Sequence, residues 1–294
     1  MADVTDMTLR LSPLHYLVFA SLFQSKEASG PAMLEFLNAI LIHVGEEPID
    51  EIIEIKSEYS LVAEGVGNKF GRLDVLVRAR SGRIFDIEVQ IEKDFMNDRG
   101  FFYGGRLMQD EVKAGVTYDK MPPARVINIV DFYVREDHSH IVEPVVLAYE
   151  NNPTEIATNV FKMYNIQLPA FRKKYRTLES VRGDTFFSWL YLLDEGYKSE
   201  SEMEVLSNMS EGMENFALRY HIAINDPRLK RLYRMQQDAE REEATRLSVA
   251  VTKAEERGAD LRNREIANGL IKSGVDPAII SKVTGLSPDE IARL

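Results

Sequence analysis

The first hydrophobic pattern along the chain has the spacing of an amphipathic helix. Between residues 14 and 41, apolar side chains recur every three or four residues, and the pair Gly30-Pro31 interrupts them. Proline lacks the backbone N–H that a helix interior uses, so this pair predicts a break between two helices. The apolar positions are Leu17, Phe19, Leu22, Phe23, Met33, Leu34, Phe36, Leu37, Ile40 and Leu41.

Strand-like patterns follow. Residues 49–62 predict a connector and a first strand. Residues 72–79 and 83–91 alternate apolar and polar side chains, and Arg80-Ser81-Gly82 between them has the composition of a turn. These two runs therefore predict an antiparallel hairpin.

The remaining segments predict further strands and then a helical second half. We expect a helix over 95–114 and strands over 125–134 and 143–149, followed by helices over 154–224. A long charged helix is expected from Leu229 to about Leu270. In the tail, Ser287-Pro288-Asp289-Glu290 has the residues of a helix start, with serine as N-cap and proline at the first position.

These patterns predict an α/β protein in three parts. Residues 1–150 would form the α/β core with a central mixed sheet flanked by helices. Residues 151–228 would form a helical extension packed on that core. Residues 229–294 would form the long charged helix and a small helical C-terminal module, with short helices in a helix-turn-helix-like arrangement.

The predicted hairpin carries the candidate chemistry. Because side chains alternate along a strand, Asp86, Glu88 and Gln90 share one face. A turn centred on Ser81-Gly82 pairs residues whose numbers sum to about 162–164, which sets Asp74 opposite Glu88 or Gln90. Two facing carboxylates repel each other unless a cation lies between them, and Mg²⁺ binds one or two carboxylates together with water and phosphate.

A plainer interpretation of the same spacing stays open. Acidic residues on the open face of a hairpin are usually solvated, and spacing alone does not distinguish the two cases. The register is also decisive, since a slip of one residue would turn Asp74 to the face opposite Glu88.

Composition and charge limit the possible partners. The chain of 294 residues has no cysteine, which excludes disulfides and thiolate zinc sites. Its net charge of −11 counts against a general nucleic-acid-coating protein, because phosphate contacts need Lys and Arg. Any such contact must come from a local basic surface.

Two local basic surfaces are candidates for phosphate contacts. The first has Arg99, Tyr103 and Arg106 on one face of the helix over 95–114. The second is a cluster with interleaved aromatic residues, over 171–176. Either surface could instead pair with neighbouring acids or pack locally. The basic residues of the second surface are Arg172, Lys173, Lys174 and Arg176.

The location expected from the sequence is the cytoplasm. The first residues carry two Asp where a signal peptide needs Lys or Arg. No apolar run approaches the roughly 18–20 residues of a membrane helix, so we expect no membrane association.

Five short runs, in this order, resemble the recombination-promoting nuclease / putative transposase family of the PD-(D/E)xK nuclease superfamily. The tail over 270–275 and 280–291 also resembles the ending common in that family. The five runs are Phe36-Leu-Asn-Ala-Ile-Leu41, Gly71-Arg-Leu-Asp-Val75, Phe85-Asp-Ile-Glu-Val-Gln90, Arg99-Gly-Phe-Phe-Tyr103 and Ile127-Asn-Ile-Val-Asp-Phe132.

The resemblance implies a PD-(D/E)xK nuclease-like core and a Mg²⁺-dependent DNA endonuclease associated with recombination or with defence against foreign DNA. It implies Asp74 and Glu88 as metal ligands, with Gln90 where the wider superfamily usually has lysine. Gln90 could orient the attacking water or a phosphate oxygen, but it can act neither as a cation nor as a general base.

One departure from the family pattern keeps other functions open. The family's first helix typically reads Asp-x-x-Phe-Lys, whereas the matching stretch here is Tyr16-Leu-Val-Phe-Ala20, with neither acid nor lysine. His15 is a possible partial substitute. The alternatives are a weakened or inactive DNA-binding protein that keeps the fold, and an interaction protein whose C-terminal helices recruit partners or form a homo-oligomer.

Overall fold

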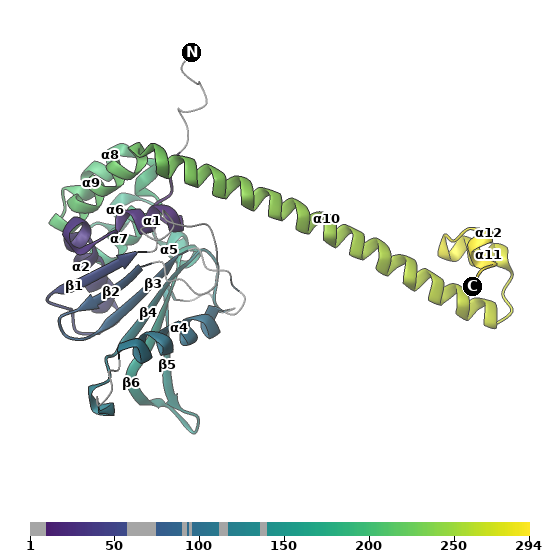
Figure 1. Ribbon diagram of the computed structural model, residues 1–294, viewed down its shortest axis with the longest axis horizontal. Coiled ribbons are helices and arrows are strands. Elements are labelled where there is room, and N and C mark those ends of the chain that lie inside the picture. The colour runs from purple at the N-terminus through teal and green to yellow at the C-terminus, as the bar shows by residue number, and fades with distance from the viewer. Residues whose placement is uncertain (1–9, 58–74, 90–92, 94–95, 112–116, 136–139) are drawn as a thin grey trace, which may run out of the picture. The chain divides into compact units, whose positions relative to one another are not determined.

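Six strands form one mixed sheet in the computed structural model, which describes residues 10–57, 75–89, 93, 96–111, 117–135 and 140–294 (Figure 1). Their order across the sheet is β1-β2-β3-β4-β6-β5. The first three pair antiparallel, β3 pairs parallel with β4, β4 pairs parallel with β6, and β5 returns antiparallel. The strands are β1(Ile52–Ser57), β2(Val75–Ala79), β3(Ile84–Val89), β4(Ala124–Val130), β5(Val142–Tyr149) and β6(Asn152–Gln167).

The expected hairpin forms with the expected register. Val75 pairs with Ile87, and Val77 pairs with Phe85, so the numbers of paired residues sum to 162. This confirms the hairpin prediction over the described residues. All six residues of β3 are buried, because neighbouring strands hydrogen-bond to both of its edges and helices contact it.

Helices cover the sheet on two faces. Helix α4(Met96–Glu111) contacts β3, β4 and β6 (Figure 1). Two glycines let it approach closely: a Cβ on Gly100 would lie 2.9 Å from a Met163 carbon, and one on Gly104 would lie 2.2 Å from a Phe161 ring carbon. On the other face, the segment that follows α2(Lys26–His43) places Glu46 against Arg125 of β4.

The break between the first two helices lies earlier than Gly30-Pro31, so that prediction was wrong. Helix α1(Tyr16–Leu22) ends before Ser25, whose side chain accepts a hydrogen bond from the Ala28 N–H and begins α2. Pro31 lies inside α2. Proline removes one hydrogen bond there, but burial of Met33, Phe36, Leu37, Ile40 and Leu41 against neighbouring elements stabilises the helix.

The helices expected from residue 154 begin later. Residues 152–167 form β6, the longest strand, and helix begins only at Leu168. The segment is rich in Thr, Ile, Val, Phe and Tyr, which favour strands, and pairing with both β4 and β5 decides its structure. The helical prediction for 154–167 was therefore wrong.

Helices α5 to α9, which follow β6 and span residues 168–225, form a layer with α1 and α2. Aromatic rings join this layer, with ring centroids 5.6 Å apart for Phe36 and Trp189 and 5.7 Å apart for Trp189 and Phe216. The other helices and short 3-10 helices between residues 118 and 225 are η2(Tyr118–Lys120), α5(Leu168–Lys174), α6(Leu178–Val181), α7(Thr185–Asp194), η3(Gly196–Lys198), α8(Glu200–Ser207) and α9(Glu211–Asn225).

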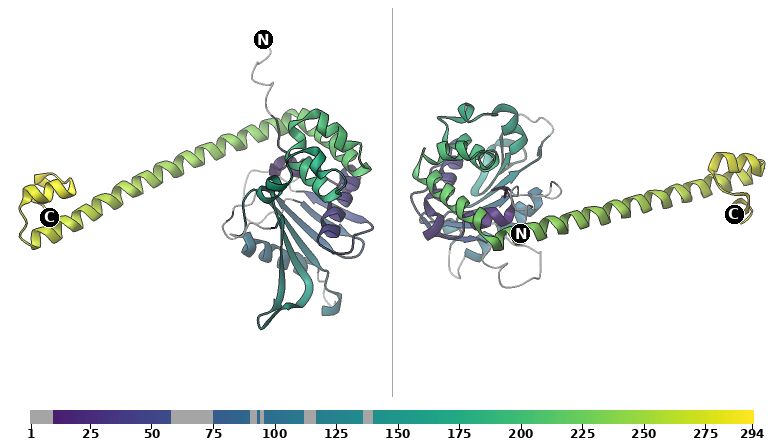
Figure 2. Two further views of the ribbon diagram at one scale, coloured as in Figure 1. Left: turned by 180° about the vertical axis from the view of Figure 1, so that it is seen from behind. Right: turned by 90° about the horizontal axis from the view of Figure 1, so that it is seen from above.

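The chain divides into two compact units, residues 1–232 and 233–294. The second unit contains most of α10(Pro227–Lys272), then α11(Pro277–Thr284) and α12(Pro288–Ile291). Ala267, Ile280, Leu286 and Ile291 form its core where α11 and α12 fold back on the end of α10 (Figure 2). Ser287 and Glu290 form the capping box that the sequence predicts. Across the described ranges, no helix has the length and apolar character to cross a membrane.

Candidate active site

Glu88 is a buried acid on a central strand. It is only 5% exposed, and Asp86, two residues earlier on the same strand face, is fully buried. A carboxylate is costly to desolvate, so neither residue belongs to an open, solvated hairpin face. The plainer interpretation of the acidic hairpin face does not hold for these two residues.

A row of buried polar side chains crosses four strands at the level of Glu88. Glu88 pairs with Asn128 of β4, Asn128 pairs with Asn165 of β6, and Asn165 pairs with Glu143 of β5. All four are less than 9% exposed. Side chains alternate along strands, so the row shares its sheet face with Val126, which contacts α4. We call these four residues the polar row.

Hydrogen bonds fix the middle of the polar row. The Asn128 amide donates to the Asn165 side-chain oxygen at 2.7 Å. The Asn165 amide donates in turn to the side-chain oxygen of Asn97, in the first turn of α4, at 3.4 Å. The row therefore lies beneath the beginning of α4, and its asparagines are held in one orientation.

A small cavity lies at the same end of the sheet. Its volume is about 170 Å³, and it is formed by the beginning of α4 and the segment after β4. Asn97 borders both this cavity and the polar row. The lining residues are Lys93, Met96, Asn97, Asp98, Phe132 and Val134.

Two of the three predicted catalytic residues lie outside the described residues. Asp74 immediately precedes β2, and Gln90 immediately follows β3. Of the three predicted catalytic residues, the structure describes Glu88. Among the described residues, no three His, Asp or Glu side chains are arranged to hold a metal ion.

The donor chemistry of the polar row suits a hard cation. Glu88 offers carboxylate oxygens and Asn128 beside it an amide oxygen, and oxygen donors are what Mg²⁺ takes from proteins. His15, the possible substitute for the missing first-helix acid, is 4% exposed at the beginning of α1, a helix that contacts β3.

Helix α4 presents a different aromatic residue from the predicted one. Tyr103 is 8% exposed and lies under the Arg99 guanidinium, which is 5.7 Å from the ring centroid. Phe102, by contrast, is 63% exposed. It lies three residues after Arg99 and four before Arg106, and both arginines are exposed. The outer face of α4 thus combines two cations with an exposed ring.

The basic cluster at the end of α5 divides into a structural arginine and exposed cations. Arg172 donates to both oxygens of the buried Asp194 carboxylate, at 2.7 and 2.6 Å, and also pairs with Asp131. These hydrogen bonds raise the pKa of Arg172. Lys173, Lys174 and Arg176 are exposed.

A partly buried acid, Glu46, lies at the other end of β4. The Glu46 carboxylate accepts hydrogen bonds from Arg125 at 2.8 Å and Tyr164 at 2.6 Å, and it pairs with Lys162 at 2.8 Å. Burial alone would raise the pKa of Glu46, but these three partners outweigh it and lower the pKa to about 2. Both carboxylate oxygens accept hydrogen bonds from protein groups, so we interpret the cluster as structural.

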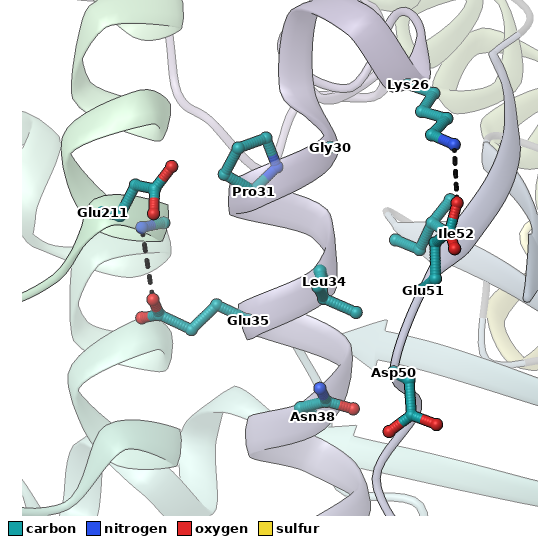
Figure 3. A pocket seen from close by; sticks show the side chains of 11 residues that line it. Lys26, Gly30, Pro31, Leu34, Glu35, Asn38, Asp50, Glu51, Ile52 and Glu211 are labelled. Atoms are coloured by element: carbon teal, nitrogen blue, oxygen red, sulfur yellow. Dashed lines mark hydrogen bonds and ion pairs between the residues drawn. The ribbon is translucent and has the colours of Figure 1, made fainter.

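A larger cavity of about 540 Å³ lies between α2, the segment before β1 and the beginning of α9 (Figure 3). Four of its polar side chains, those of Lys26, Glu35, Asn38 and Glu51, bond to the protein itself. Glu35 accepts from the Gly212 N–H at 3.2 Å and from Trp189, Lys26 pairs with Glu51 at 3.1 Å, and Asn38 bonds the Ile49 backbone. None of the predicted site residues that the structure describes lines this cavity.

The sequence prediction missed the asparagines of the polar row and Phe102. The asparagines were visible as polar residues within the otherwise apolar strand runs Val126-Ile-Asn-Ile-Val130 and Met163-Tyr-Asn-Ile166. Such a residue in a buried strand indicates a hydrogen-bonded or functional position. Phe102 could not be separated from Tyr103 without the orientation of the helix.

Two family models match the chain. Residues 13–250 match the model of the PD-(D/E)XK nuclease family transposase, and residues 262–294 match that of the Rpn/YhgA-like nuclease family, C-terminal HTH domain. No curated protein and no solved structure is significantly similar. The first match covers more than half of the chain and confirms the resemblance seen in the sequence. The chain therefore belongs to the PD-(D/E)XK nuclease family transposases.

Proposed function

We propose that the protein is a metal-dependent DNA endonuclease whose site centres on Glu88. The observation that carries the proposal is the burial of this acid on the central strand, next to the hydrogen-bonded Asn128–Asn165 pair. If the pairing of β2 with β3 continues by one residue, Asp74 faces Glu88. Both carboxylates would then hold Mg²⁺ or another divalent cation.

Each residue has a limited role in this proposal. The bound metal would supply Lewis acidity and a more acidic water. Glu88 and Asp74 bind it, and Gln90 orients the attacking water or a phosphate oxygen through its amide. The Asn128–Asn165–Asn97 chain keeps the neighbourhood of Glu88 in a fixed geometry beneath α4, as outer hydrogen bonds do at other metal sites.

The nucleic acid would contact exposed basic surfaces, because the whole chain is acidic. Arg99 and Arg106 of α4 would bind phosphates, and Phe102 between them would stack on a base. Lys173, Lys174 and Arg176 form a second contact. The C-terminal module, which matches a helix-turn-helix model, would bind duplex DNA. Recombination or defence against foreign DNA is the proposed setting.

The sequence of the first helix supports a second candidate function, DNA binding with little or no cleavage. The stretch Tyr16–Ala20, where the family typically has an acid and a lysine, is mostly buried apolar helix here. A protein with this change would bind DNA but cut it slowly or not at all.

Nicking of supercoiled plasmid separates the two functions. We expect wild type to nick DNA with Mg²⁺ or Mn²⁺, and we expect EDTA or Asp74→Ala to abolish nicking. If folded wild type nicks DNA with none of the metals but still shifts DNA in a gel-retardation assay, the binding function is established instead. Equal nicking by wild type and Asp74→Ala would remove Asp74 from the site.

A further inference from the structure

Much of helix α10 is exposed in the part of the chain that the structure describes. Every residue from Arg241 to Arg262 is exposed. An isolated helix gains little stability from backbone hydrogen bonds alone, and most helices in proteins are stabilised by burying an apolar face. This stretch nevertheless contains large exposed apolar side chains, among them Leu247 (65% exposed), Val251 (48%) and Leu261 (63%).

The apolar and small residues of this stretch follow a coiled-coil spacing. They alternate steps of three and four residues and form one continuous stripe about 27 Å long. The polar residues fall on the other faces of the helix. The stripe, called the seam below, consists of Ala244, Leu247, Val251, Ala254, Gly258 and Leu261.

We propose that the seam binds the seam of a second copy of this chain in antiparallel orientation. The sizes of its residues favour that orientation. When Ala244 of one copy lies opposite Leu261 of the other, Leu247 lies opposite Gly258 and Val251 lies opposite Ala254. Each layer of the interface then holds one larger and one smaller side chain. Parallel pairing would match each residue with itself, and its Gly–Gly and Ala–Ala layers would leave voids between Leu–Leu layers.

The charges along one edge of the seam favour the same orientation, because only antiparallel pairing forms an ion pair there. Along one edge, the helix carries Glu243 towards its N-terminal end and Arg257 and Arg264 towards its C-terminal end. Antiparallel helices bring Glu243 to Arg264 of the partner on this edge, whereas on the other edge Arg241 faces Arg262 of the partner. In parallel pairing, Glu243 would face Ser248 and Arg257 would face Arg262, so no ion pair forms and two arginines repel.

Substitution of two almost equally exposed valines, one on the seam and one off it, tests whether the seam mediates dimerisation. Val251 lies on the seam and Val249 lies off it, and they are 48% and 49% exposed. By sedimentation of the full chain, we expect a dimer of twice 33.5 kDa for wild type and for Val249→Glu. We expect Val251→Glu to dimerise at least about tenfold more weakly, because it buries a charge. A monomeric wild type, or equal effects of the two substitutions, would overturn the proposal.

Cysteine cross-linking tests the orientation, and the chain contributes no cysteine of its own. Chains with Ala244→Cys and size-tagged chains with Leu261→Cys are oxidised separately and then as a mixture. Antiparallel pairing predicts a disulfide between the two kinds of chain and none within either kind. Disulfides within each kind would show parallel pairing and overturn the proposal, as would the absence of any cross-link in the mixture.

Discussion

At the scale of single residues, Glu46 shows how this fold handles a buried charge. The carboxylate is shared by Arg125, Lys162 and Tyr164, which come from two neighbouring strands, while Glu46 itself follows α2. The Glu46 carboxylate therefore links the segment after α2 to strands β4 and β6 through hydrogen bonds and ion pairs. Removing one member of such a group leaves buried cations without a counter-charge, which costs about 3–5 kcal/mol in comparable buried pairs.

We expect Glu46→Gln to lower the free energy of unfolding by roughly 3 kcal/mol at neutral pH. The folded pKa of about 2 lies below the ordinary value of 4.5, so the charge stabilises the fold fully above pH 4.5 and less as pH falls towards 2. Denaturant unfolding of wild type and variant should therefore converge over that interval. Exposed Glu47→Gln is the control. A difference that stays constant down to pH 3 would contradict this explanation.

Arg172 and its neighbours give a second prediction at this scale. Arg172→Ala leaves the buried Asp194 carboxylate without its bidentate partner, and we expect a loss of roughly 3 kcal/mol in unfolding free energy. Lys173→Ala and Lys174→Ala should change the free energy of unfolding by less than about 0.5 kcal/mol. Both should weaken DNA binding, and the binding constant should depend less steeply on salt concentration because one phosphate contact is lost. Chemical denaturation and DNA titrations at several salt concentrations measure both. Equal losses of stability in all three variants would contradict the distinction between a structural Arg172 and DNA-binding Lys173 and Lys174.

At the scale of elements, the position of α4 depends on its glycines. This helix lies over the polar row and presents Arg99, Phe102 and Arg106 outward, so its distance from the sheet sets the geometry of the candidate site. Gly104 lies against the buried Phe161 ring, whereas a Cβ on the adjacent Gly105 would meet no atom within 4 Å. The pair offers a direct test of close packing.

We expect Gly104→Ala to destabilise the protein by about 1–3 kcal/mol, because the new methyl group overlaps the Phe161 ring. Gly105→Ala in the same helix should stabilise it by up to about 1 kcal/mol, since alanine favours helix and the space is open. Thermal unfolding compares the two. A stabilising Gly104→Ala would mean that α4 does not approach the sheet this closely.

Local signals predicted the elements whose structure is decided locally. The hairpin register followed from one turn, and the last helix followed from the Ser287 cap. Residues 152–167 became a strand because β4 and β5 pair with it on either side, which no local pattern reports. The break expected at Gly30-Pro31 failed because packing of α2 outweighed a single missing hydrogen bond.

The candidate site was predictable only in part for the same reason. Glu88 was identified from strand alternation and family resemblance, and its burial removes the solvated alternative for this residue. The asparagines beside it come from strands about 40 and 77 residues further along the chain, and parallel pairing across β3, β4 and β6 brings them together. The catalytic roles of Asp74, Glu88 and Gln90 stay predictions.

At the scale of the whole molecule, two units fold around separate cores. The single tryptophan, Trp189, is buried in the first unit, whereas Ile280 is buried in the core of the second. Tryptophan fluorescence therefore reports on the first unit, and far-ultraviolet circular dichroism reports on both.

We expect Ile280→Ala to unfold the C-terminal module at lower denaturant concentration, because a buried isoleucine truncation costs roughly 2–5 kcal/mol, a large share of the stability of so small a core. Circular dichroism should show the early loss of helix, while the fluorescence transition of Trp189 keeps its midpoint. A fluorescence midpoint that shifts with the substitution would show that the two units unfold as one.

The most direct test of the Glu88-centred nuclease compares two buried acids of the polar row. Glu88→Gln and Glu143→Gln each remove one charge from the same sheet face, and Glu143 lies three strands away, with one carboxylate oxygen lacking a hydrogen-bond partner among the described residues. Plasmid nicking with Mg²⁺ should fall at least about 100-fold in Glu88→Gln and stay near wild type in Glu143→Gln, with both variants folded. Unchanged nicking by Glu88→Gln would contradict the assignment of this acid to the metal site.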